Sequence, residues 1–151
     1  MPSWMNSLGI SASGLTAQSL RMDVIANNIA NANTTRTASG GPYRREMVEL
    51  QPQQASQPFS SWLQSALGSN STPTAADAGV RVAGIVQDPS PFKLVYDPTN
   101  PDAVNGYVQM PNVNVSTEMA DMISASNAYQ ANVTAFDAGK QMMLDALNLG
   151  K

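Results

Sequence analysis

Hydrophobic side chains recur with a seven-residue period at both ends of the chain. In the N-terminal part, Leu8, Leu15, Met22 and Ile29 are spaced by seven, and small residues follow the first three after four positions: Ala12, Ser19 and Ala26. In the C-terminal part the same alternation of four and three residues connects Val115, Met119, Met122, Ser126, Tyr129, Val133, Phe136, Lys140, Met143 and Leu147. This spacing is typical of coiled-coil helices. It predicts helices over residues 4–33 and 115–148, about 45 and 50 Å long.

Prolines separate these two ends from the middle of the chain. None occurs between Pro2 and Pro42, and none follows Pro111. Because proline inside a helix costs about 3 kcal/mol, the proline-rich middle is not helical throughout. Short runs with β-branched and aromatic residues predict strands there, at residues 43–50, 79–88, 92–96 and 106–110.

The sequence therefore predicts an α+β fold in which long terminal helices form a coiled-coil-like helical core beside a small β-rich region. We expect an N-terminal assembly helix with an asparagine motif at 1–36, a β-rich middle region at 37–111 and a C-terminal assembly helix at 112–151. Residues 52–78 are rich in Gln, Ser, Pro and Thr, and this composition is typical of a flexible loop.

The scarcity of charge on the predicted helices indicates that other chains cover them. Charged residues make up 13% of the chain, roughly half the usual share. Residues 1–33 carry only Arg21 and Asp23, whereas a helix with one side in water needs a polar face. One interpretation is an antiparallel helical pair inside a single chain. The interpretation that we favour adds further partners, since more apolar residues lie off the C-terminal seven-residue pattern: Ile123, Ala125, Ala128, Ala131, Ala135, Ala138 and Met142.

Composition excludes most catalytic and nucleic-acid functions. The chain has no cysteine and no histidine, so it lacks the thiol nucleophile and the commonest general base and metal ligand. A net charge of -3 argues against nucleic acid. Asp97 and Asp102 are too few for a calcium site. We expect no enzyme, no metal and no cofactor; the alternative is a soluble enzyme that uses Asp97, Asp102 or Glu118. The sequence also has neither a cleavable signal peptide nor an apolar run long enough to span a membrane.

Four asparagines crowd the end of the first predicted helix, in the stretch "ANNIANANT" at residues 26–34. Asparagine is a poor helix former because its side chain competes for backbone groups. Two roles are open for Asn28 and Asn31: bonds to backbone groups and partners across a contact between chains, or simple capping of the helix. Asn27 and Asn33 are expected nearer a turn. At the start of the second helix, Asn114 is typical of an N-cap.

Three stretches resemble the flagellar rod and hook proteins, and in particular their proximal-rod members. They are "IANNIANANTTR" at 25–36, "GGPYRREMV" at 40–48, and the segment 93–150 that begins "KLVYDPTNPDAVNGYVQMPNV". The resemblance implies a structural subunit of the bacterial flagellar basal body, in the periplasmic proximal rod that transmits torque. Its partners would be copies of itself, other rod proteins and the flagellar type III export apparatus, with no nucleic acid and no membrane insertion. Another rod paralogue, or a component similar to a secretion needle, is the alternative.

The contacts between subunits are expected to involve apolar residues of both helices together with two asparagines. The expected interface comprises Leu8, Leu15, Met22, Ile25, Asn28, Ile29, Asn31, Met119, Met122, Tyr129, Val133, Phe136, Met143 and Leu147.

Overall fold

The computed structural model describes residues 3–38, 40–54 and 77–149. Helix α1 spans Ser3–Ala30 and helix α3 spans Val115–Leu149. Between them lie four strands: β1 at Glu46–Gln54, β2 at Asp77–Gln87, β3 at Lys93–Tyr96 and β4 at Tyr107–Met110. The expected α+β fold, with long terminal helices around a small β-rich middle, is confirmed.

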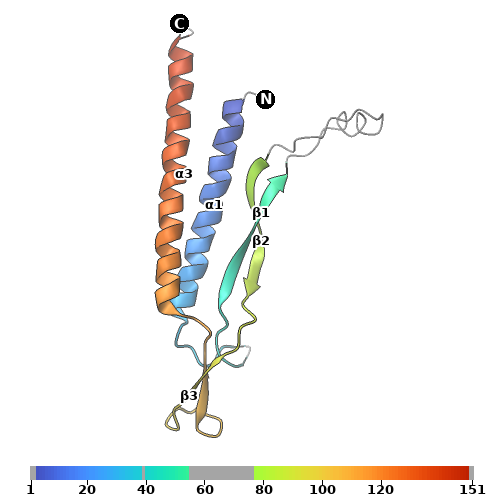
Figure 1. Ribbon diagram of the computed structural model, residues 1–151, viewed down its shortest axis with the longest axis vertical. Helices are drawn as coiled ribbons and strands as arrows, with labels where there is room; N and C mark the ends of the chain where they lie inside the picture. Colours follow the sequence, from blue (N-terminus) through green and yellow to red (C-terminus); the bar gives the residue numbers. More distant parts are fainter. Residues whose placement is uncertain (1–2, 39, 55–76, 150–151) are drawn as a thin grey trace, which may run out of the picture.

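Helices α1 and α3 lie side by side and run in opposite directions, so that both chain ends are at the same end of the molecule (Figure 1). The two helices approach closely at small residues. A side chain added at Gly14 would meet the amide of Asn132, and one added at Gly139 would meet Leu8. The core is small and is centred on Ala17, Val24 and Ile25 of α1 and Ala125 of α3.

Several buried positions of α3 lie one residue before the positions that the seven-residue period predicts. Glu118, Ala125 and Gly139 are buried, and each precedes a position of the predicted period, namely Met119, Ser126 and Lys140. Met119 is 57% exposed. One residue corresponds to about 100° around a helix, so this part of the predicted stripe faces away from α1.

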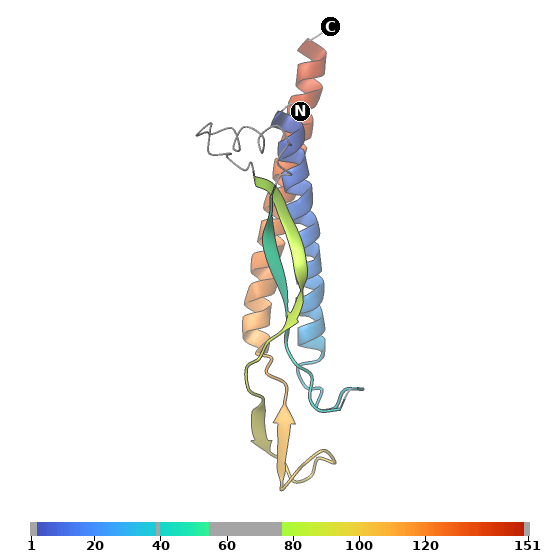
Figure 2. The ribbon, with the colours of Figure 1, turned by 90° about the vertical axis from the view of Figure 1, so that its right-hand side faces the viewer.

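Strands β1 and β2 form a long antiparallel ribbon that lies along α1 (Figure 2). The ribbon pairs Glu46 with Gln87 at one end and Gln54 with Asp77 at the other. A hydrogen bond joins the ribbon to α1, because the backbone N–H of Val80 donates to the Ser13 hydroxyl at 3.1 Å. Gly79 fits this contact because its φ of 103° is left-handed and a Cβ would overlap Ser13.

Strands β3 and β4 form a second antiparallel hairpin at the end of the molecule opposite the two chain ends (Figure 1). Tyr96 and Tyr107 pack edge to face across it, with ring centroids 5.3 Å apart. Both rings are largely exposed, as are Leu94 and Val104. The hairpin is covered on one face only, because Val108 of β4 is buried, while the face that carries Leu94 and Tyr107 is exposed.

The strand predictions were right in kind and differ in their bounds. β1 continues to Gln54 and β2 begins at Asp77, so both ends of the expected loop 52–78 belong to the ribbon. Residues 55–76 lie outside the described residues. α1 ends at Ala30, three residues before the predicted end, and residues 31–33 form a turn. Within the described residues, neither helix is long and apolar enough to cross a membrane.

Candidate assembly surfaces and a buried polar cluster

Asn28 is the centre of a buried polar cluster that joins α1, β1 and α3. Its side chain is 1% exposed. The amide nitrogen donates to the carbonyl of Glu46 at 2.8 Å and to Glu118 at 3.0 Å, while the amide oxygen accepts from the Glu46 N–H and the Tyr43 hydroxyl, both at 3.0 Å. The Asn28 side chain therefore pairs with the first residue of β1 as a neighbouring strand would, and its hydrogen-bonding capacity is fully used.

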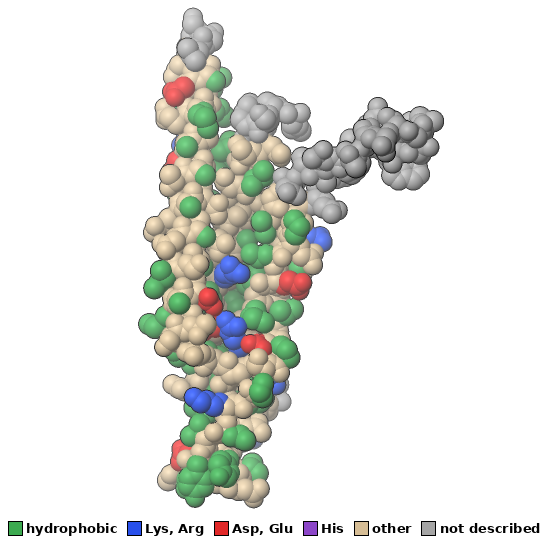
Figure 3. Space-filling view, in the orientation of Figure 1, with side chains coloured by type: hydrophobic (Ala, Val, Ile, Leu, Met, Phe, Trp, Pro, Cys, Tyr) green, Lys and Arg blue, Asp and Glu red, His purple; other side chains and the backbone are tan. Residues whose placement is uncertain are grey.

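Glu118 and Arg45 form the ionic part of this cluster. Glu118 is 0% exposed, and its other carboxylate oxygen accepts from Arg45 Nε at 2.5 Å. Partial burial would lower the pKa of Arg45, but the hydrogen bond to Glu118 and the nearby carboxylates hold that pKa above its ordinary value. Burial, and then the charges of Glu46 and Glu118, raise the pKa of Tyr43. Charged side chains accordingly gather in the middle of the face seen in Figure 3.

Asp88 connects the buried polar cluster to the end of the β1–β2 ribbon. Its carboxylate lies 3.7 Å from Arg45 Nη1, and its backbone N–H donates to the Arg45 carbonyl at 2.8 Å. Hydrogen bonds from the Ser90 hydroxyl and N–H lower the pKa of Asp88. Asn112 extends the same network, accepting from the Arg45 N–H at 2.8 Å. These contacts fix the point at which the chain leaves the ribbon for the second hairpin.

The asparagine motif makes several hydrogen bonds within the chain. Asn28 is 1% exposed and belongs to the buried polar cluster, whereas its predicted contact with another subunit stays a prediction. Asn31 has a capping geometry, because its amide donates to the Asn27 carbonyl at 3.0 Å and its oxygen accepts from Thr34 at 3.2 Å. Asn33 lies in the turn, whereas Asn27 is still in α1 and exposed. Asn114 caps α3, accepting from the Ser116 N–H at 3.1 Å.

The remaining predicted interface residues fall into three groups. Ile25 is buried in the core. Met119, Met143 and Leu147 are exposed on α3. The others are half-buried: Leu8, Leu15, Met22, Ile29, Met122, Tyr129, Val133 and Phe136.

Large apolar side chains of α3 form two exposed patches. The first, which we call the lower stripe, consists of Val115, Met119 and Ile123 at successive i, i+4 positions, and Ile123 is 63% exposed. The second, which we call the helix tip, consists of Met142, Met143, Leu144 and Leu147. The seven-residue period did not include Ile123, Met142 or Leu144, although Ile123 and Met142 were among the apolar residues noted beside it. Exposed apolar patches of this kind are typical of binding surfaces.

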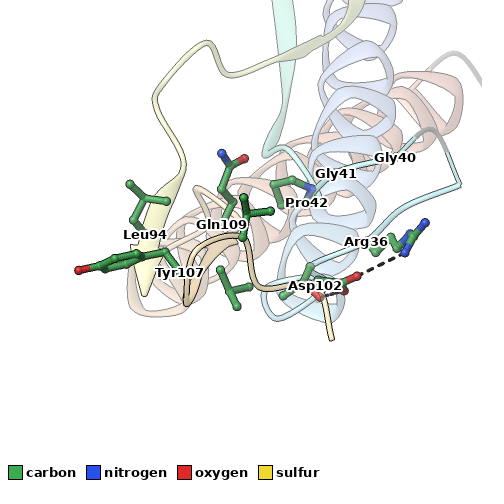
Figure 4. Close-up of a pocket in the computed structure, with 11 residues that line it drawn as sticks. Arg36, Gly40, Gly41, Pro42, Leu94, Asp102, Tyr107 and Gln109 are labelled. Carbon is green, nitrogen blue, oxygen red and sulfur yellow. Dashed lines mark hydrogen bonds and ion pairs between the residues drawn. The ribbon is translucent and has the colours of Figure 1, made fainter. Parts of the chain in front are cut away.

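A third apolar surface lies at the opposite end of the molecule, where green side chains gather over the β3–β4 hairpin in Figure 3. Beside it, a cavity of about 480 Å³ opens between the hairpin and residues 35–36 and 40–42. Figure 4 shows Leu94 and Tyr107 on the hairpin side of this cavity and Arg36 on the other. Asp102 joins the two sides, since it accepts from Thr35 at 3.0 Å and from Arg36 at 3.5 Å.

The carboxylates considered for an enzyme have separate structural partners. Asp97 accepts from Thr99, Asp102 from Thr35 and Arg36, and Glu118 belongs to the buried polar cluster. Among the described residues, no group of three acidic side chains is placed to hold a metal ion.

Two families of known proteins match the two ends of the chain. Residues 8–36 match the family described as "Flagella basal body rod protein", and residues 104–149 match "Flagellar basal body rod FlgEFG protein C-terminal". The two matches cover most of α1 with the asparagine motif, and β4 with α3.

Several proteins named flagellar basal-body rod protein FlgC are similar to nearly the whole chain. The relative from Bacillus subtilis is 49% identical over 151 residues, which is 97% of each chain. The relative from Borreliella burgdorferi is 46% identical over 94% of each chain, and that from Escherichia coli O6:H1 is 43% identical over 97% of this chain and 98% of its own. At this identity and coverage, the chain belongs to the FlgC family of flagellar basal-body rod proteins.

Proposed function

We propose that this chain is a structural subunit of the proximal rod and polymerises through its terminal helices into the periplasmic shaft that transmits torque. The observation that carries the proposal is the exposure of large apolar side chains along α3 in a chain of the rod family. Residues 1–36 and 112–151 supply the assembly helices, and residues 37–111 supply the middle region. Its partners are copies of itself and other rod proteins.

The separate positions of the apolar patches suit an open polymer. A patch that meets a different patch on the next subunit generates a continuing helix rather than a closed pair. The lower stripe and the helix tip occupy different parts of α3, and the hairpin surface lies on another element. Burial of these side chains stabilises each contact in proportion to the apolar area removed from water.

The proposed role requires no catalytic residue and no cofactor. It does require delivery across the inner membrane, and we assign this to the flagellar type III export apparatus. The relatives' names place those proteins in the basal body. A different position within the rod is the alternative, and site-specific crosslinking in isolated basal bodies distinguishes the neighbours.

The substitution Ile123→Asp tests assembly through α3. Ile123 is exposed in the single chain, so the variant should fold, but in the rod its carboxylate would be buried without a partner at a cost of several kcal/mol. Cells that carry only this variant should lose swimming motility and lack rods in electron micrographs of basal bodies. Circular dichroism of the purified variant should match that of the wild type.

The matched control is Thr117→Asp, which adds the same charge at an exposed polar position of α3 about 120° around the helix from Ile123. This strain should swim normally. Normal motility and complete basal bodies in the Ile123→Asp strain would show that the lower stripe is not an assembly surface.

A further inference from the structure

We propose that Asn105 is a site of spontaneous deamidation, in which the backbone nitrogen of Gly106 attacks the side-chain amide, and that the folded turn slows this reaction. The two residues lie directly before β4, in the hairpin at the end of the molecule opposite the two chain ends (Figure 1). They form the only Asn-Gly pair in the chain. The proposal concerns the chemistry of this turn and does not depend on the proposed function.

The backbone of the turn explains why these two residues occur together. Asn105 has a φ of 54° and Gly106 a φ of 82°, and Asn-Gly is a preferred pair where both φ angles are positive. Two hydrogen bonds close the turn: the Tyr107 N–H donates to the Val104 carbonyl at 3.0 Å, and the Val104 N–H donates to the Tyr107 carbonyl at 2.9 Å. A Cβ at position 106 would lie 3.0 Å from the ring of Tyr96. Both the backbone angles and the packing therefore favour the reactive pair.

Both reacting groups are accessible. Asn105 is exposed, and neither its side-chain amide nor the Gly106 N–H has a hydrogen-bond partner among the described residues. Because glycine has no Cβ, its backbone nitrogen can approach the preceding side chain without the hindrance that other residues introduce. Every other asparagine in the chain is followed by a residue with a side chain. Asn105 is thus the asparagine best placed for this reaction.

The reaction replaces the side-chain amide by a carboxylate. The Gly106 nitrogen loses its proton and bonds to the side-chain carbonyl carbon of Asn105, while the bond from that carbon to the amide nitrogen breaks and ammonia leaves. Water then opens the resulting cyclic imide. Addition at the side-chain carbonyl gives aspartate, and addition at the backbone carbonyl gives isoaspartate, in which the main chain runs through the side-chain carbon. The sum consumes one water, releases one ammonia and needs no oxidant or reductant.

The folded turn opposes the reaction, and the product opposes the turn. Attack requires rotation about the bond between Cα and the carbonyl carbon of Asn105, and the two hydrogen bonds between Val104 and Tyr107 resist this rotation. Deamidation therefore follows local opening, which a two-stranded sheet covered on one face permits. Isoaspartate lengthens the main chain by one atom, so the two closing hydrogen bonds can no longer form together.

Peptide mapping by mass spectrometry tests the site. The purified chain is incubated at neutral pH and physiological temperature and sampled over several weeks, beside a synthetic peptide of residues 101–110 that lacks β3. We expect the fragment that contains Asn105 to gain the mass of an amide-to-acid exchange before any other asparagine reacts, with isoaspartate detected by an isoaspartyl methyltransferase. The folded chain should react more slowly than the peptide. An unchanged Asn105, earlier reaction at another asparagine, or equal rates in chain and peptide would overturn the proposal.

The matched control is Asn105→Gly, because Gly-Gly also favours this turn but has no side-chain amide. Hydrogen exchange at the Val104 and Tyr107 N–H groups is compared between fresh and incubated samples of each chain. We expect the incubated wild type to lose protection in proportion to its isoaspartate content, and the incubated variant to keep the protection of its fresh sample. Equal losses in the two chains, or full protection in deamidated wild type, would show that deamidation does not open the turn.

Discussion

At the scale of single residues, Asn28 shows why an asparagine occurs near the end of a helix that carries almost no charge. Its amide satisfies both backbone groups of Glu46 as well as Tyr43 and Glu118. The sequence indicated that the asparagines bond backbone groups, but the contacts at Asn28 lie within the chain. No local pattern reveals this, because Glu118 is 90 residues from Asn28 in the sequence.

The substitution Asn28→Ala should destabilise the folded chain by about 2–4 kcal/mol, since it leaves several buried donors and acceptors without partners. Denaturant unfolding of the purified chain measures this loss. Asn27→Ala is the control, because Asn27 is exposed on the same helix and alanine favours the helix. Equal stability of the two variants would mean that the cluster around Asn28 contributes nothing to folding.

At the scale of elements, the seven-residue period predicted both helices but identified the side of α3 that faces α1 only in part: Tyr129 lies beside α1, whereas Met119 is exposed. The facing side carries Glu118 and Asn132 beside Ala125 and Gly139, so an apolar pattern could not identify it fully. Polar residues can be buried on this side because β1 and its neighbour Arg45 supply hydrogen-bond partners for the cluster around Glu118. The predicted stripe instead includes exposed residues such as Met119, which are available to other subunits.

The close approach of the helices predicts the effect of a larger residue at Gly14. A Cβ there would already lie 2.8 Å from Asn132 Nδ2, so Gly14→Leu must displace the Asn132 side chain and crowd the contact between α1 and α3. Overpacking typically costs about 1–3 kcal/mol, partly offset by about 1 kcal/mol from removing a glycine from a helix. The melting temperature should therefore fall. Ala12→Leu, at an exposed position of the same helix, should leave it unchanged or raise it, and the opposite order would contradict the packing described.

At the scale of the whole molecule, the spacing of prolines was sufficient to predict a helix, a β-rich middle and a second helix. It could not predict that the β1–β2 ribbon lies along α1 while β3 and β4 extend from the opposite end, because docking depends on contacts such as Ser13 with Val80. The exposed hairpin was likewise unforeseen as a surface. Its strands were recognised from β-branched and aromatic residues, but burial is a property of the tertiary arrangement.

Shortening the segment between β1 and β2 separates the contribution of the assembly helices from that of the middle region. The ribbon register extends to the pair Gln54 and Asp77, so replacing residues 56–75 with a short Gly-Ser turn leaves the described pairing in place. Loop-closure entropy changes slowly with loop length, and the cost to folding should be small. We expect the shortened chain to assemble and its strain to swim, in contrast to the Ile123→Asp strain on the same soft-agar plate. If the shortened chain is produced at the wild-type level and its strain does not swim, this segment is itself part of the functional surface, and assembly does not depend on the helices alone.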